Sequence, residues 1–232
     1  AKESKIALQS YRFKRGTIMS KKEKIVLTRN SFFEFHLKNI HKKFINFLKR
    51  NLFKKKLDEE VNSEDPRDQK NIIIVELESA MYGGLFIHKG ILNIIGFPNQ
   101  DFYLYEDDHE WTYRITKCGG AIYAVLNSKI EDLDFSSMVA TNPTDTIFSS
   151  ISKGEPFRVY YRVRNRVYFE VNNLVNNKFV YWLNITTFLF FTSLCNTKNL
   201  KLIINAIKDG YKGKLGKVDI FNDWNCKDVS KS

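Results

Sequence analysis

Short apolar segments alternate with glycine-ended helical segments between residues 71 and 126, and this alternation constrains the fold more than any other feature of the sequence. Two apolar segments have the length and side chains typical of strands, Asn71–Leu77 and Ala121–Leu126, and a shorter apolar segment, Leu85–Ile87, lies between them. Asp107 or Asp108 is a suitable N-cap for a helix that Gly119 would end. Strands that alternate with helices predict an α/β sheet, with binding or catalytic groups on loops at the strand ends.

Strand and helix patterns also lie outside this region. We expect further strands at residues 5–13, Lys24–Thr28 and Phe102–Tyr105, and a short helix at Lys89–Ile95. Beyond residue 141 the pattern predicts helices at Phe157–Glu170, Phe179–Cys195 and Leu200–Asp209. The chain therefore divides into a sheet region, residues 1–140, and a helical region, residues 141–232. A basic helical insertion near residues 31–57 would interrupt the first.

Charge and cysteine content restrict the partners and the compartment. The 232 residues carry a net charge of +11, which favours an anionic partner such as nucleic acid, acidic lipid or a phosphorylated ligand. Cys118, Cys195 and Cys226 lie far apart in no metal-binding spacing, so we expect reduced thiols in a cytosolic protein.

Two segments suggest contact with a membrane. Every charged residue between Lys38 and Lys56 is basic, and apolar residues recur there at helical spacing. This helix would lie on an anionic membrane surface or, equally well, pack on its own domain as a solvated helix. The segment 179–195 is strongly apolar but shorter than the roughly 20 residues of a spanning helix, so we interpret it as buried or interfacial, with a single membrane pass as the alternative.

An acidic cluster at the start of the predicted helix is the best chemical lead. Four carboxylates occur within five positions, at Glu106, Asp107, Asp108 and Glu110. Aromatic residues on both sides predict that part of this acid is desolvated, where a carboxylate can act as a base or hold a cation. The alternative is a helix start in which one aspartate caps the helix and Glu110 interacts with the helix dipole.

Five pieces of the sequence, spread over residues 70–217, resemble in order and spacing the C-terminal half of the catalytic domain of family 2 glycosyltransferases, of the rhamnosyl- and galactofuranosyl-transferase type. They are Tyr82–Ile87 (YGGLFI), Ile95–Pro98 (IGFP), Asp107–Arg114 (DDHEWTYR), Tyr160–Arg166 (YYRVRNR) and Asp209–Gly216 (DGYKGKLG). The resemblance implies a GT-A-like (Rossmann-type) mixed sheet, followed by C-terminal helices and lacking its N-terminal nucleotide-binding half. It implies an inverting transfer of a sugar from a nucleotide-sugar donor to a glycan or lipid-linked acceptor, in polysaccharide biosynthesis at the cell envelope.

The resemblance also assigns roles to individual residues. The general base would be Asp107, with Asp108 as the other candidate, and it would take the proton of the acceptor hydroxyl. Glu110, Trp111 and Arg114 would shape the acceptor side, with an ion pair between Glu110 and Arg114 one helical turn apart. Further substrate-binding residues form the loop Tyr82, Gly83 and Gly84, whose bare glycine backbone would lie close to the donor.

Two departures from the family concern the metal. Where many relatives have a metal-binding histidine, this chain has Asp132, an oxygen ligand that suits Mg²⁺ or Mn²⁺. The family's Asp-x-Asp, which holds the metal and the diphosphate, would precede residue 1. Asp132-Leu133-Asp134 has the right residue types but follows the acidic helix. We therefore expect residues 1–232 alone to be inactive, and the whole enzyme to act at the cytoplasmic face of the membrane.

A second class of function stays open, in which the chain is a non-catalytic basic protein of a membrane surface or of nucleic acid. Arg158, Arg162 and Arg166 lie four residues apart on one face of a predicted helix. This face would contact lipid phosphate or nucleic acid, but we favour the interpretation that it is the solvated side of the helix. Nucleic acid is the less favoured partner because no known reading module is present. A metal-dependent phosphohydrolase is a third, weaker option.

Overall fold

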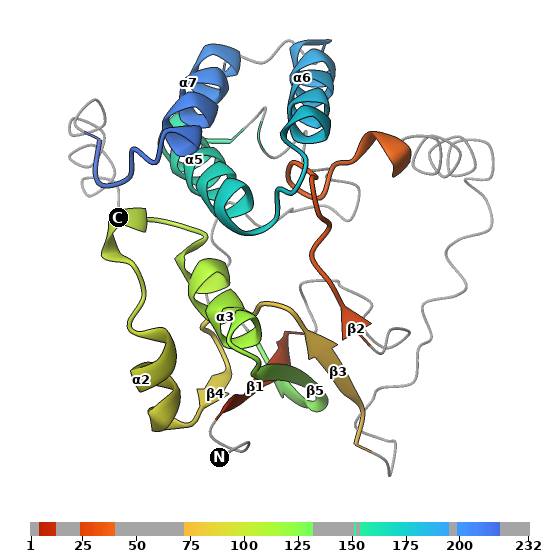
Figure 1. Ribbon diagram of the computed structural model, residues 1–232, viewed down its shortest axis with the longest axis vertical. Coiled ribbons are helices and arrows are strands. Elements are labelled where there is room, and N and C mark those ends of the chain that lie inside the picture. The colour runs from red at the N-terminus through yellow and green to blue at the C-terminus, as the bar shows by residue number, and fades with distance from the viewer. Residues whose placement is uncertain are drawn as a thin grey trace.

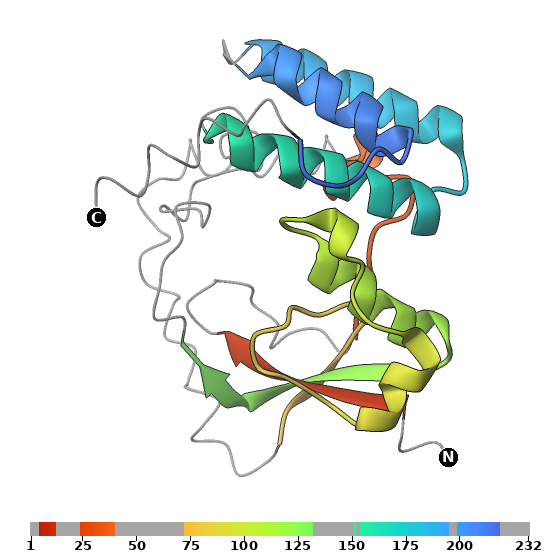
Figure 2. The ribbon, with the colours of Figure 1, turned by 90° about the vertical axis from the view of Figure 1, so that its left-hand side faces the viewer.

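The computed structural model describes residues 5–12, 24–39, 72–131, 151, 154–194 and 199–218. These residues form layers that follow one another along the long axis of the molecule (Figures 1 and 2). The layers are a β-sheet, then helix α3 (Asp107–Lys117), then helix α5 (Pro156–Asn173), and last the helices α6 (Lys178–Leu194) and α7 (Leu200–Tyr211). The sequence segments with the acidic residues and with the arginines thus occupy neighbouring layers.

The sheet of the described residues has five strands in the order β2-β3-β5-β1-β4. Their bounds are β1 Ile6–Arg12, β2 Lys24–Ile25, β3 Ile74–Leu77, β4 Leu85–Ile87 and β5 Ala121–Ile130. β1 runs parallel to β5, and β2 runs parallel to β3, whereas the pairs β3–β5 and β1–β4 are antiparallel. The structure therefore confirms a mixed α/β fold.

One face of the sheet forms a hydrophobic core with α3 and with the short helix α2 (Leu92–Ile95), which continues the 3₁₀ helix η5 (Lys89–Ile91). Because successive side chains of a strand point to opposite faces, Ala7, Ile122 and Ala124 share this core, and Leu8 lies on the exposed side. Trp111 and Ile115 of α3 complete the packing.

The helical layers have a separate core, in which α5, α6 and α7 pack together. Three phenylalanines from the other end of the chain belong to it: Phe32, Phe33 and Phe35. Their rings contact one another and Phe188 of α6, with the Phe32 and Phe188 centroids 4.9 Å apart. The segment that contains β2 therefore leaves the sheet and ends in the helical core, near the 3₁₀ helix η3 (Leu37–Asn39).

Most elements expected from the sequence are present. The strands β1, β2, β3 and β5 and the helices α3, α5, α6 and α7 agree in position with their predictions, and Gly119 ends α3 with a left-handed φ of 75°. β4 is formed by the apolar segment Leu85–Ile87, for which no strand was predicted. The expected basic helix beyond residue 39 lies outside the described residues. Within the described part of the chain, no helix has both the length and the apolar character needed to cross a bilayer.

The expected strand Phe102–Tyr105 is wrong. Residues Gln100–Phe102 form the 3₁₀ helix η6, and the following loop has left-handed φ values of 61°, 65° and 65° at Tyr103, Tyr105 and Glu106. The aromatic run that suggested a strand instead places Leu104 and Tyr105 against the helical core. The acidic pair therefore follows an irregular loop, not the end of a strand.

Candidate functional site

The acidic helix α3 begins without the side-chain cap expected from the sequence. Its N-cap is Glu106, in a left-handed conformation and with no side-chain hydrogen bond to the helix. Asp107 and Asp108 are the first two residues of the helix, so neither is the N-cap. Both lie with Glu110 in the first turn, where the positive end of the helix dipole favours carboxylates.

The loop before α3 is held by a side chain of α5. Asn165 is fully buried, and its Nδ2 donates to the carbonyl oxygens of Phe102 (2.7 Å), Leu104 (2.6 Å) and Tyr105 (3.0 Å). Arg158 Nη1 also donates to the Tyr105 hydroxyl oxygen at 2.8 Å. Buried carbonyls need hydrogen-bond donors, and this irregular loop cannot find them in a sheet, so α5 supplies them.

Arg166 of α5 joins the same region through three carboxylates. Its Nε lies 2.7 Å from Glu170, its Nη1 3.3 Å from Glu106 and its Nη2 3.2 Å from Glu34. Burial opposes the charge of Arg166, but Glu106, Glu170 and Glu34 outweigh it and raise the pKa of the guanidinium. Burial also raises the pKa of Glu170 to about 7, against the lowering effect of Arg166.

The expectation that Arg158, Arg162 and Arg166 form the solvated side of a helix is wrong. Arg166 is 7% exposed, and burial lowers the pKa of Arg162. Arg158 and Arg162 are intermediate in exposure, and Arg158 is bonded to Tyr105. α5 is covered on both sides, by α3 and its loop and by the other helices, so its arginines face carboxylates and aromatic rings from distant parts of the chain (Figure 2).

Tyr82 links the glycine loop to the acidic helix. Its ring centroid lies 5.8 Å from that of Trp111. Burial raises the pKa of Tyr82, and the nearby negative charge of Asp107 raises it further. Burial likewise raises the pKa of Asp108, whereas His109 opposes that shift. Of the two candidate bases, Asp107 acts on Tyr82 of the loop through its charge, and Asp108 has the pKa that burial raises.

Gly83 and Gly84 allow the backbone to approach β1 closely. Gln9 Nε2 donates to the Gly83 carbonyl at 2.7 Å, and the Ser10 amide donates to the Gly84 carbonyl at 2.9 Å. A Cβ atom at Gly83 would lie 1.5 Å from Nη2 of Arg12, so the missing side chain leaves room for this guanidinium. The glycine pair therefore packs against β1 and Arg12.

Glu110, Trp111 and Arg114 connect α3 to the turn at Gly96. Arg114 forms the expected ion pair with Glu110, with nitrogen–oxygen distances of 2.8 and 2.5 Å. Its Nη1 also donates to the carbonyls of Ile95 (3.0 Å) and Phe97 (3.2 Å), and Trp111 Nε1 donates to that of Gly96 at 2.8 Å. Trp111 and Arg114, both expected at the acceptor side, thus stabilise the turn at Gly96, and Glu110 holds Arg114 in place.

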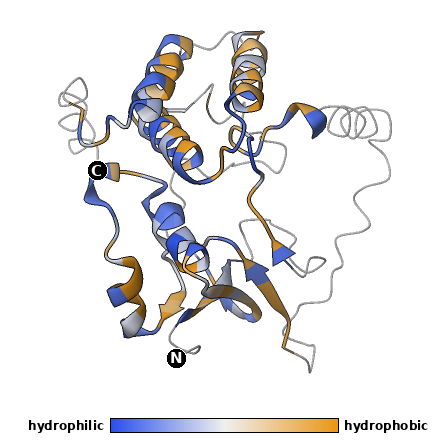
Figure 3. Ribbon diagram, viewed as in Figure 1, coloured by the Kyte–Doolittle hydropathy of each residue, from blue (hydrophilic) through white to orange (hydrophobic). Residues whose placement is uncertain are grey.

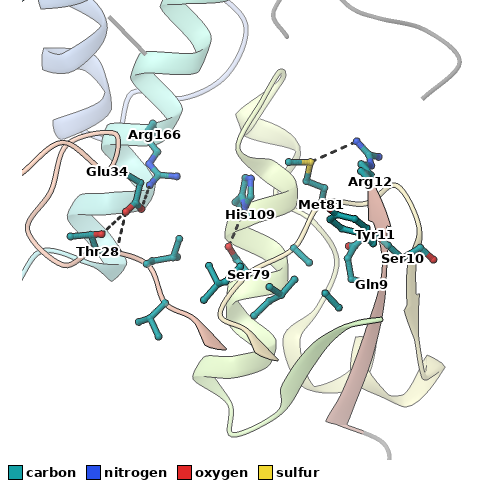
Figure 4. A pocket seen from close by; sticks show the side chains of 16 residues that line it. Gln9, Ser10, Tyr11, Arg12, Thr28, Glu34, Ser79, Met81, His109 and Arg166 are labelled. Carbon is teal, nitrogen blue, oxygen red and sulfur yellow. Dashed lines mark hydrogen bonds and ion pairs between the residues drawn. The ribbon is translucent and has the colours of Figure 1, made fainter. Parts of the chain in front are cut away.

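A cleft of about 530 Å³ lies between β1, β2, α3 and α5 (Figure 4). Its polar side chains come from both regions of the chain and include Arg12, Thr28, Glu34, Ser79, His109 and Arg166. On its floor, Ser79 Oγ lies 3.1 Å from His109 Nδ1. His109 is the cleft residue closest in sequence to the acidic pair, and Asp107 and Asp108 are not among the lining residues.

The sequence did not single out several of these cleft residues. Ser79 follows the end of β3, a position at which a polar residue could have been noted. Glu34 and Gln9 carried no comparable signal, because their relation to the site depends on where β1 and the Phe32–Phe35 turn pack. The four-residue spacing of the arginines identified Arg166 but placed it on the solvated side of a helix.

The metal site implied by the resemblance cannot be built from the described residues. Asp132 lies outside them, and within them no three histidine, cysteine, aspartate or glutamate side chains are grouped as metal ligands. No step of the reaction proposed below is therefore assigned to a metal. In comparisons with known proteins, no family model, curated protein or solved structure matches this chain.

Proposed function

We propose that this chain is the acceptor-side part of an inverting glycosyltransferase, which moves a sugar from a nucleoside-diphosphate donor to a hydroxyl of a glycan or lipid-linked acceptor. The observation that supports the proposal is the contact between the rings of Tyr82 and Trp111. Through this contact the glycine loop lies beside the Asp107–Arg114 segment, although 23 positions separate Gly84 from Asp107 in the sequence. Both segments carry the family resemblance.

Asp107 is the general base in this proposal. Its carboxylate would take the proton from the acceptor hydroxyl while that oxygen attacks the anomeric carbon and the nucleoside diphosphate leaves. The ring contact of Tyr82 with Trp111 would hold the start of α3, and Asp107 with it, beside the glycine loop. Asp108 is the other candidate, since a carboxylate with a raised pKa is a stronger base.

Glu110 and Arg114 would form the wall against which the acceptor lies, and the buried Trp111 would support it from the core. The ion pair of Arg114 with Glu110 and the bonds of Arg114 and Trp111 to the Gly96 turn fix these side chains before any substrate binds, which favours a preformed site. The exposed ring of Tyr82 would supply an aromatic surface at the same place, packed on Trp111. The donor diphosphate would be held with Mg²⁺ or Mn²⁺, for which Asp132 is the candidate ligand in this chain.

The test is sugar transfer by the full-length protein with a panel of nucleotide sugars, Mn²⁺ and glycan or lipid-linked acceptors. Asp107→Asn should lower the rate at least about 100-fold, because it removes the base but not the shape of the side chain. Asp101→Asn is the matched control, since Asp101 is exposed and lies in η6. A rate within a few fold of wild type for Asp107→Asn would shift the assignment to Asp108, and no transfer by any variant or by wild type would remove the proposal.

The alternative, a non-catalytic basic protein that binds nucleic acid or a membrane surface, is less well supported in its nucleic-acid form. Two of the arginines that suggested phosphate contacts are engaged inside the protein: Arg166 with three carboxylates, and Arg158 with the hydroxyl of Tyr105. Measuring binding to duplex DNA at increasing salt concentration separates the two functions, since a protein that contacts DNA phosphates loses affinity steeply as the salt concentration rises. As either a glycosyltransferase or a membrane-surface protein, we propose that the protein is cytoplasmic and lies peripherally on the inner face of the membrane.

A further inference from the structure

The helix α6 has an apolar face that the described residues of the protein leave exposed. Its inner face packs in the helical core through Tyr181, Asn184, Ile185, Phe188 and Thr192. Its opposite side, here called the outer face, consists of residues at helical spacing: Phe179, Trp182, Leu183, Phe190 and Leu194. Phe179, Phe190 and Leu194 are 77%, 59% and 67% exposed. Figure 1 shows α6 in the layer farthest from the sheet, and Figure 3 shows its largely hydrophobic colouring.

The hydroxyl groups of this helix do not make the outer face polar. Thr186 and Thr187 both donate to the carbonyl of Leu183, at 3.0 and 2.8 Å, and Ser193 donates to that of Phe190 at 2.7 Å. Hydroxyls that bond back to their own helix need no partner from water. α6 is therefore largely apolar around its circumference, which is typical of a helix that is covered on all sides, whereas the described residues cover only its inner face.

Lysines lie on α6 and on its neighbour α7. Between residues 171 and 208 the sequence contains no aspartate or glutamate. Lys178 begins α6, and Lys201 and Lys208 of the neighbouring α7 are exposed. At the edge of the face, the rings of Trp182 and Tyr211 lie 5.2 Å apart. Aromatic rings beside lysines are typical of a surface that contacts lipid headgroups.

We propose that the outer face of α6 lies in the interface of an anionic lipid bilayer, with the helix parallel to the membrane plane. The aromatic and leucine side chains would enter the boundary between headgroups and acyl chains, and the lysines would contact lipid phosphates. A second copy of the chain fits this face less well, because a two-fold contact would bring the same lysines together with no carboxylate from α6 between them. The inference does not depend on the proposed transfer reaction.

Flotation of the 232-residue protein with vesicles tests the proposal. Vesicles of phosphatidylcholine with phosphatidylglycerol should carry the protein, and vesicles of phosphatidylcholine alone should carry less of it. The double variant Phe179→Glu/Phe190→Glu should bind the anionic vesicles at least about tenfold more weakly, which corresponds to about 1.4 kcal/mol. Phe86→Glu/Phe97→Glu is the matched control, since it changes the charge equally at two phenylalanines that are 78% and 75% exposed elsewhere.

The outcomes separate the candidate partners. Loss of flotation in the α6 variant but not in the control, with both variants folded by circular dichroism, is the expected result. Equal binding by wild type and the α6 variant would refute the proposal, as would equal loss in both variants. Sedimentation analysis covers the remaining case: a wild-type dimer that the α6 variant makes monomeric would identify the outer face as a contact between copies and would also overturn the proposal.

Discussion

Asn165 Nδ2 lies 2.6 Å from the carbonyl oxygen of Leu104, across the boundary between the helical layers and the acidic helix. The same nitrogen also donates to Phe102 and Tyr105, so one amide group holds the loop that contains three left-handed residues. This loop determines where α3 begins and therefore where Asp107 and Asp108 lie. The geometry of the candidate site thus depends on a side chain that belongs to a different layer.

Asn165→Ala should destabilise the protein by about 2–3 kcal/mol, because it leaves the partly buried carbonyls of Leu104 and Tyr105 without their donor, whereas Phe102 keeps a bond from Arg164. Urea unfolding measures the change. Asn172→Ala on the same helix is the matched control, since Asn172 is exposed and donates only to Tyr168 one turn before it. That variant should stay within about 0.5 kcal/mol of wild type. Equal effects of the two substitutions would show that the loop does not need Asn165.

Arg166→Met should destabilise the protein by about 3–5 kcal/mol, because it leaves the buried carboxylate of Glu170 without its cation. The double variant Arg166→Met/Glu170→Gln should recover part of this loss. Glutamine carries no charge, and its single oxygen can accept from the Phe33 amide, which lies 3.0 Å from Oε1 of Glu170. The Tyr181 hydroxyl, 3.0 Å from Oε2, can then accept from the glutamine amide nitrogen. A double-mutant cycle in urea measures the coupling, and additive effects would contradict a direct ion pair.

Asp108→Asn should stabilise the protein at neutral pH and have little effect in acid. Burial raises the pKa of Asp108 above its ordinary value of 3.8, so the folded state binds more protons than the unfolded state above that pH. The free energy of unfolding of the wild type should therefore fall, relative to that of Asp108→Asn, as the pH rises through and above 3.8. Thermal unfolding of both proteins between acid and neutral pH tests this, with Asp101→Asn as the exposed control. A pH-independent difference would mean that Asp108 is not desolvated.

Gly84→Ala should be more destabilising than Gly119→Ala, although both glycines have left-handed φ values, of 77° and 75°. At Gly119 the added methyl group meets no atom within 4 Å, so the loss is the backbone term of about 1–2 kcal/mol. At Gly84 it would also lie 2.6 Å from Ile130 Cδ1 and 2.9 Å from Ser10 Cβ, which adds about 1–3 kcal/mol of overpacking. Similar values in chemical denaturation would contradict the close packing of the glycine loop on β1.

Local patterns predicted the elements well because their signals are contained in neighbouring residues. The β-branched segment before Leu77 formed β3, and the helical segment ended by Gly119 formed α3. The aromatic segment before Glu106 was wrongly predicted to be a strand, because its conformation is determined by Asn165, which lies about 60 positions later. A donor so far along the chain leaves no trace in local periodicity.

The candidate site was predictable only where its contacts are local. The ion pair of Glu110 with Arg114 follows from their spacing of four residues in a helix. The environment of Arg166 could not be predicted, since two of its three carboxylates, Glu34 and Glu106, come from loops distant in sequence. Sequence spacing alone made this arginine resemble a solvated residue, because burial of charge requires partners that only the tertiary fold brings together.

Because of the turn at Phe32–Phe35, the sheet region and the helical region cannot be separated by a cut at residue 140 without exposing part of the helical core. β2 pairs with β3 in the sheet, and a few residues later Phe32 and Phe33 insert their rings among the helices. A protein cut between the two regions would carry these rings on the wrong piece, uncovered and prone to aggregation. Attempts to express the sheet region by itself should therefore also delete or replace these phenylalanines, and the helical region would need them supplied as a separate peptide.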